Sequence, residues 1–227
     1  MRYDAVFIDV DGTLLYVDLD IEGYIEDLAP YSGNGGLTAE KVTGPAWGSL
    51  RRHIEGNIGY RTEEGLAGFK RLNARLTGAE IGIEAPDEVL AEVAERRISF
   101  NPYPESEAVL RCLREMGTRV FVVSNWDIEL VRVLEDLGWS RFFDGVIASA
   151  VVGVEKPEGK IFEEALRAGG IPHDRVVHVG NDPITDVAGA SEADIDTVLV
   201  DRRGTATAPE ATFVLPDLNG LPKVVEG

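Results

Sequence analysis

The sequence predicts an α/β fold with a doubly wound, Rossmann-like parallel sheet that is interrupted by a helical insertion. The apolar run Ala5–Val10 suits a strand buried on both faces. From about Thr118 onward, strands alternate with helices, which is typical of a parallel sheet with right-handed crossovers. Residues 17–98 carry helical patterns but no convincing buried strand. We therefore expect a core formed by residues 1–16 and 99–227, with the insertion as a second domain.

Each predicted element follows from its apolar spacing and its end residues. In the stretch "DIELVRVLEDLG" apolar residues share one helical face, Asp127 is a plausible N-cap and Gly138 a stop. Pro102 and Pro104 disfavour continued helix where the insertion returns to the core. The insertion should hold helices over residues 46–56, 62–78 and 87–99. The core should continue with helices over 107–117, 127–138, 159–170 and from Asp186, and with strands over 118–124, 143–149, 175–180 and 196–200.

Composition restricts the partners of this protein. The 40 acidic and 22 basic residues give a formal charge of −18, which disfavours attraction to nucleic acid or to anionic membranes. The longest apolar runs are far too short to cross a bilayer. The single cysteine, Cys112, excludes an internal disulfide and lies on an apolar helical stripe. We expect a soluble, cytoplasmic protein, either a monomer or a homodimer.

Two acids stand where the first apolar strand ends, in the stretch "FIDVDGTLL". In an extended strand Asp9 and Asp11 point to the same side, Gly12 allows a sharp turn behind them, and Thr13 offers a hydroxyl. Adjacent carboxylates repel unless a cation or proton lies between them, which favours a Mg²⁺ site. A strand end whose acids simply face water is an equal alternative on these residues alone.

Three further polar clusters follow predicted parallel strands, at the edge where open α/β sheets bind ligands. Ser124 and Asn125 precede a helix, so a hydroxyl, an amide and free backbone N–H groups could receive an anion. Lys156 follows the next strand, and Asp182 and Asp186 follow "VVHV". Each cluster alone could be a helix cap or a surface charge. Together they predict carboxylates, hydroxyl, amide and ammonium at one edge.

These residues resemble the haloacid dehalogenase superfamily of hydrolases. The four motifs "DVDGT", "SN", "EKP" and "GNDPITD" occur in the family's order, and the resemblance covers residues 4–16 and about 104–201. The helical insertion, residues 17–98, resembles the small helical cap domain of the family. The resemblance implies that Asp9 is a nucleophile forming an aspartyl-phosphate and also a Mg²⁺ ligand. It implies that Asp11 is the general acid and base, with its backbone carbonyl on the metal.

The resemblance also assigns roles to the other motif residues. It implies that Ser124 and Lys156 hold the transferring phosphoryl group, with Thr13 and Asn125 beside them, and that Asp182 completes the metal site. These roles make physical sense, because a carboxylate and a phosphate are both negative and need cations to offset their repulsion.

The fourth motif departs from the common pattern, which has an acid directly after the glycine. Asn181 takes that place and Asp182 follows. We favour Asp182 as the metal ligand because a carboxylate binds Mg²⁺ better than an amide. Asp186, one turn further on, could be a second ligand or could orient Lys156. His178 lies within a strand, so we expect a buried neutral histidine rather than a catalyst.

The sequence therefore predicts a Mg²⁺-dependent phosphatase that acts on a small phosphorylated metabolite. A 2-haloacid dehalogenase on the same fold is the first alternative, and Asp11 argues against it because dehalogenases generally lack this acid. A phosphomutase would share these residues, and a catalytically idle binding protein is the remaining alternative. Trp126 either lines the site or packs at the sheet edge.

Overall fold

The computed structural model describes residues 1–33 and 36–227, which form two compact units. One unit comprises Met1–Tyr16 and Pro102–Gly227, and the other comprises Val17–Asn101. The second unit extends slightly beyond the expected return at residue 99 because two short strands join the units. Strand β2 (Leu15–Leu19) leaves the first unit and pairs with strand β3 (Ile98–Pro102), which returns to it.

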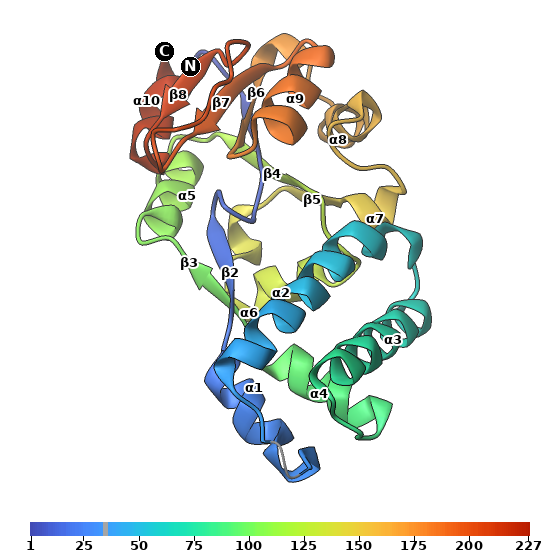
Figure 1. Ribbon diagram of the computed structural model, residues 1–227. Coiled ribbons are helices and arrows are strands. Elements are labelled where there is room, and N and C mark those ends of the chain that lie inside the picture. Colours follow the sequence, from blue (N-terminus) through green and yellow to red (C-terminus); the bar gives the residue numbers. More distant parts are fainter. Residues whose placement is uncertain (34–35) are drawn as a thin grey trace. The chain divides into compact units, whose positions relative to one another are not determined.

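The first unit is built on a six-stranded parallel sheet in the order β5-β4-β1-β6-β7-β8 (Figure 1). This sheet confirms the predicted α/β class. Strand β1 lies near the centre, where apolar residues buried on both faces are expected. The three-residue strand at the β8 edge was not predicted from the sequence. The strands are β1 (Ala5–Ile8), β4 (Arg119–Ser124), β5 (Gly145–Ala148), β6 (Val176–Gly180), β7 (Asp196–Val200) and β8 (Phe213–Leu215).

Helices cover both faces of this sheet, because successive strand residues point to opposite sides. On one face, Phe7 and Phe121 pack with Phe162 and Ala165 of helix α8. In Figure 1, α8 and α9 lie on one side of the sheet, and α5 and α10 lie on the other. The helices of this unit are α5 (Ser106–Glu115), α6 (Leu130–Asp136), α7 (Ser149–Val152), α8 (Gly159–Gly169), α9 (Gly189–Glu192) and α10 (Leu221–Glu226).

The second unit is helical, as the apolar spacing of the insertion predicts. Thr38 and Thr62 cap helices α2 and α3 by accepting backbone N–H groups, and Gly82 ends α3 in a left-handed conformation. Arg52 of α2 donates to the side chains of Asn73 and of two further residues on α3, so it joins the two helices. The helices are α1 (Ile21–Leu28), α2 (Ala39–Gly56), α3 (Glu63–Ile81) and α4 (Asp87–Arg96).

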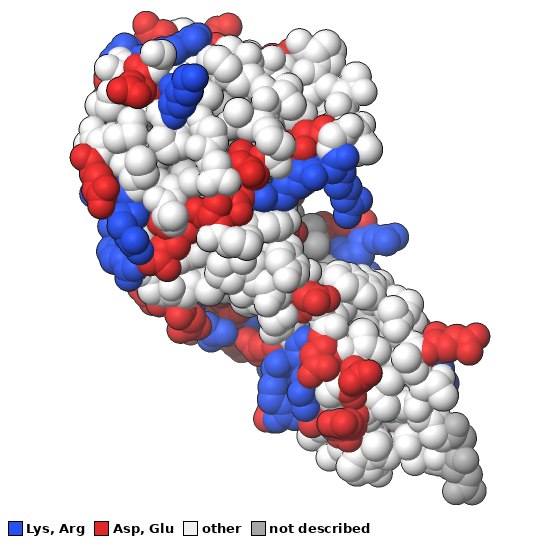
Figure 2. Space-filling model, turned by 90° about the vertical axis from the view of Figure 1, so that its left-hand side faces the viewer, with Lys and Arg blue, Asp and Glu red and all other residues white. Residues whose placement is uncertain are grey.

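Charged side chains of both signs are interspersed on the face of the molecule seen in Figure 2. Figure 2 shows Lys and Arg side chains among Asp and Glu side chains on the face in view. Ion pairs such as Arg97–Asp27 and Arg175–Asp4 join them at 2.7 and 2.6 Å. Ion pairs at or near the surface add little stability individually. Within the described residues, no helix combines the length and the apolar character that crossing a bilayer requires.

Candidate active site

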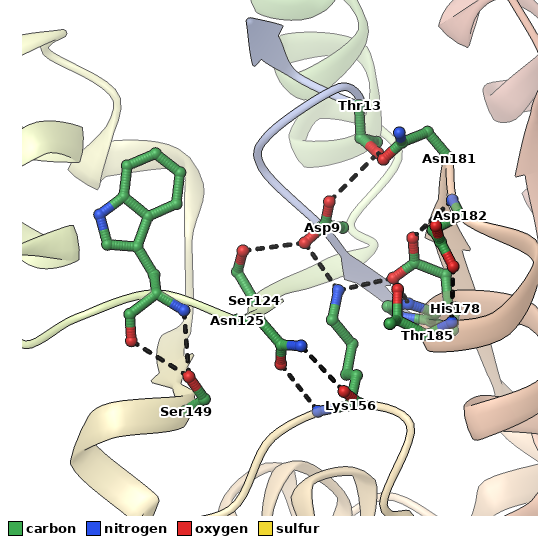
Figure 3. A network of polar contacts seen from close by, with 12 residues as sticks. Asp9, Thr13, Ser124, Asn125, Ser149, Lys156, His178, Asn181, Asp182 and Thr185 are labelled. Carbon is green, nitrogen blue, oxygen red and sulfur yellow. Dashed lines mark hydrogen bonds and ion pairs between the residues drawn. The ribbon is translucent and has the colours of Figure 1, made fainter. Parts of the chain in front are cut away.

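The candidate site lies at the carboxyl ends of three neighbouring strands. Asp9 follows β1, Ser124 ends β4, and Asn181 and Asp182 follow β6. Because β4, β1 and β6 are adjacent and parallel, their carboxyl ends share one edge of the sheet. Lys156 reaches this edge from the loop between α7 and α8 (Figure 3).

The centre of the site is a buried lysine shared by two buried acids. Lys156 Nζ lies 2.7 Å from Asp9 Oδ1 and 2.6 Å from Asp186 Oδ1. All three residues are at most 6% exposed. Burial lowers the pKa of Lys156, but the two carboxylates outweigh that effect and raise it. Lys156 is therefore a fixed cation beside Asp9.

The pKa values of the two acids shift in opposite directions. Burial raises the pKa of Asp9, and the opposing attraction to Lys156 does not cancel this effect. Burial also acts to raise the pKa of Asp186, but Lys156 and the hydrogen bond from His178 outweigh it and lower this pKa. Asp186 is thus the firmly ionised partner of Lys156. Of these two carboxylates, the ionised form of Asp9 would be stabilised more by an additional cation.

Asp186 is held by three donors. Its Oδ1 contacts Lys156 Nζ and His178 Nε2, at 2.6 and 3.0 Å, and its Oδ2 accepts the backbone N–H of Asp182 at 2.9 Å. Gly180 makes this position accessible, since a Cβ at residue 180 would lie 2.1 Å from the carboxyl carbon of Asp186. This geometry supports the second expectation for Asp186, the orientation of Lys156.

Asp9 is also held by hydroxyl groups. Ser124 Oγ donates to Asp9 Oδ1 at 2.8 Å, while the buried Thr13 hydroxyl lies 3.5 Å from Asp9 Oδ2 and 3.2 Å from Asn181 Oδ1. Gly12 has φ +77°, and a Cβ there would lie 2.3 Å from the Asn181 amide nitrogen. A glycine is therefore required for the close approach of Asn181 to the first loop.

The side chain of Asn125 holds the backbone of Lys156. Its Oδ1 accepts the N–H of Lys156 at 2.7 Å, and its Nδ2 donates to the carbonyl of Lys156 at 2.9 Å. The amide that was expected to bind phosphate is thus already occupied in positioning the lysine loop. Trp126, which is half-buried, exchanges backbone hydrogen bonds with the Ser149 hydroxyl.

Asp9 and Asp11 do not share one buried position. Strand β1 ends at Ile8, so the alternation that predicts a common side for these acids does not extend through Asp11. Asp9 is buried, whereas Asp11 is exposed. The Asp11 side chain is therefore accessible to solvent, whereas that of Asp9 is not.

The side chain of Asp182 caps a helical segment, whereas the sequence predicts that it is a metal ligand. Its Oδ1 accepts the N–H groups of Ile184 and Thr185, at 2.8 and 2.7 Å, and caps the π-helical segment Pro183–Ala188. The predicted helix therefore begins at Pro183 and not at Asp186, because Pro is favoured in a first helical turn. The side chain that contacts the Thr13 hydroxyl beside Asp9 is Asn181.

Sequence reasoning missed Arg202. Its guanidinium donates to the Thr13 carbonyl at 2.8 Å and to Glu105 at 2.7 Å, and it lies 3.5 Å from the centre of the Tyr103 ring. Arg202 therefore holds the loop that follows Asp9. A signal was present, because Arg202 follows the predicted strand over 196–200, at the same end as the other site residues.

The fold and the site together define an α/β enzyme with a buried acid and lysine at the ligand-binding edge of its sheet. The chain belongs to the haloacid dehalogenase-like hydrolases, whose family model matches residues 3–194. This match confirms the family that the four motifs predict.

Curated relatives of this chain include both a phosphatase and a dehalogenase. The glyceraldehyde 3-phosphate phosphatase of Methanothermobacter thermautotrophicus is 33% identical over 86% of this chain and 84% of its own length. The (S)-2-haloacid dehalogenase H-109 of Pseudomonas putida is 26% identical over 88% of this chain and 87% of its own length. The chain is also similar to the crystal structure of a HAD phosphatase from Thermococcus onnurineus. The match covers 99% of this chain and 98% of that chain, with a TM-score of 0.63 and 24% identity.

Proposed function

We propose that this protein is a Mg²⁺-dependent phosphatase that hydrolyses a small phosphomonoester through an aspartyl-phosphate on Asp9. The observation that carries the proposal is the contact of Asp9 Oδ1 with both Lys156 Nζ and Ser124 Oγ. A buried cation and a hydroxyl beside a carboxylate are the groups that a transferring phosphoryl group requires. The higher identity to a phosphatase than to a dehalogenase supports the same choice.

The proposed reaction has two displacements. In the first, an oxygen of Asp9 bonds to phosphorus while the bond from phosphorus to the leaving oxygen breaks, and Asp11 gives that oxygen a proton. In the second, Asp11 takes a proton from water, whose oxygen bonds to phosphorus and releases phosphate and the Asp9 carboxylate. Lys156 and Ser124 hold the phosphoryl oxygens throughout.

The residues at this edge fit a hard divalent cation. Asp9 Oδ2 and Asn181 Oδ1 both lie close to the Thr13 hydroxyl, and Mg²⁺ prefers oxygen ligands. Within the described residues, no three His, Cys, Asp or Glu side chains form a metal-binding group. Asn181, and not Asp182, approaches the Thr13 hydroxyl beside Asp9. On this geometry we assign the metal to Asp9, the Asp11 carbonyl and Asn181. When bound, Mg²⁺ would offset the negative charge of the phosphate.

The first test measures phosphate release from an aryl phosphate, with Mg²⁺ and with EDTA, alongside halide release from a 2-haloacid. We expect phosphate release that EDTA abolishes, and no halide release. The panel should then include glyceraldehyde 3-phosphate, the compound in the name of the Methanothermobacter relative. Metal-independent halide release without phosphate release would refute the phosphatase and support the dehalogenase alternative.

Variants of Asn181 and Asp182 test the metal assignment. We expect Asn181→Ala to raise the Mg²⁺ concentration for half-maximal activity by about tenfold or more, because it removes an oxygen ligand. Asp182→Asn keeps a good N-cap while removing the charge, so this concentration should change by less than about twofold. A Mg²⁺ titration of phosphate release checks both values. The opposite result would return the metal to the Asp182 carboxylate.

A further inference from the structure

We propose that His178 is a positioning residue whose Nε2–H holds Asp186 in place, so that Lys156 stays between Asp186 and Asp9. Its catalytic consequence rests on the proposed phosphatase function, whereas the contact itself does not. His178 touches none of the groups that would react with phosphate. It acts through Asp186, then through Lys156, on the acid that would be the nucleophile.

The position of His178 is set by the sheet and by one helix. His178 lies on β6, opposite Phe7 of β1 and Thr197 of β7. Its ring is completely buried and meets the ring of Phe162 of α8 edge to face, with ring centres 5.0 Å apart. Burying a polar ring costs free energy, and a hydrogen bond to one of its nitrogens offsets part of that cost.

The contacts of the two ring nitrogens define the form of the ring. Nε2 lies 3.0 Å from Asp186 Oδ1, whereas Nδ1 is buried without a hydrogen-bond partner. Asp186 can only accept when ionised, so the hydrogen must be on Nε2. A hydrogen on Nδ1 would be a buried donor without an acceptor, and would leave two lone pairs facing each other at Asp186. The structure therefore assigns the neutral Nε2–H tautomer to His178.

This hydrogen bond affects the balance at Lys156. His178 and Lys156 donate to the same oxygen of Asp186, and Lys156 also reaches Asp9 with a similar distance, 2.6 against 2.7 Å. When the His178 donor is removed, Oδ1 of Asp186 relies on Lys156 alone and attracts the ammonium group away from Asp9. Charge-assisted hydrogen bonds are strong enough for this loss to weaken catalysis.

Two amide substitutions form a matched pair. The amide nitrogen of His178→Gln can occupy the place of Nε2 and donate to Asp186, while the shorter side chain of His178→Asn leaves its amide near the place of Nδ1. Relative to wild type, we expect His178→Gln to keep kcat within about threefold and His178→Asn to lose about tenfold or more. KM should change by less than about threefold in both variants, because the side chain at position 178 would not contact substrate. Equal losses in both variants, after correction for the folded fraction, would overturn the proposal.

Nitrogen NMR of the wild-type protein tests the contact without measuring activity. The chain has three histidines, His53, His173 and His178, so a long-range ¹H–¹⁵N spectrum is simple to assign with the His178→Gln variant. We expect His178 to show a hydrogen-bearing Nε2 and a bare Nδ1, with an Nε2 shift that Asp186→Asn changes. A hydrogen on Nδ1 would refute the proposal. The NMR and activity results can also differ. If the spectrum is as expected but the protein releases no phosphate, the proposed function is refuted and the His178–Asp186 contact is supported.

Discussion

Replacing Asp9 by asparagine is expected to abolish phosphomonoester hydrolysis, with a loss of roughly 10⁴-fold or more in kcat. Asparagine has nearly the same shape, so it should preserve the packing around the end of β1. It lacks the anionic oxygen that would bond to phosphorus, and it weakens the attraction to Lys156, now 2.7 Å away. Phosphate release from an aryl phosphate under saturating Mg²⁺ measures the effect.

The matched control for this prediction is Asp136→Asn, because Asp136 is an exposed acid at the end of α6. It should leave kcat unchanged within about twofold. Asp11→Asn gives a complementary result, since it should slow release of phosphate from Asp9 and so trap one phosphoryl group on the protein. Intact-protein mass spectrometry detects that adduct. Metal-dependent hydrolysis by purified Asp9→Asn at the wild-type rate would falsify the mechanism.

Replacing Lys156 by methionine is expected to reduce both activity and stability. Methionine has a similar length but no charge, so two buried carboxylates, Asp9 and Asp186, would lose the cation between them. Removing one partner of a buried ion pair costs about 3 to 5 kcal/mol of the free energy of unfolding. We expect a loss of kcat of about 10³-fold, because the phosphoryl group loses its cation as well. Urea unfolding and phosphate release measure the two effects.

Two further variants separate charge from shape at this position. Lys160→Met removes an exposed lysine from α8 and should change the free energy of unfolding by less than about 0.5 kcal/mol. The double variant Lys156→Met with Asp186→Asn should recover part of the lost stability, because it removes one of the two facing charges, without recovering activity. If Lys156→Met were as stable as wild type, the buried ion pair would not be the centre of the site.

Several parts of this protein could be predicted from local sequence because the determining groups are adjacent in the chain. The central strands follow from short apolar runs, and the helices of residues 17–101 follow from apolar spacing and from caps such as Thr38 and Thr62. The short strands at Leu15–Leu19 and Phe213–Leu215 are half-exposed and have no strong pattern, so they were missed. Each of them is a strand only because it pairs with another, β2 with β3 and β8 with β7.

Apolar periodicity along the chain is enough to predict the α/β class and the edge of the sheet at which the candidate site lies, because it shows which strands are buried and polar residues follow the ends of those strands. The sequence also predicts Asp9, Ser124 and Lys156 at that edge. The approach of Asn181, and not Asp182, to Thr13 could not be predicted from the local sequence, and neither could the contact of Arg202 with the same loop. The orientation of a polar side chain depends on which hydrogen-bond partners are within reach, and these partners come together only when distant segments pack.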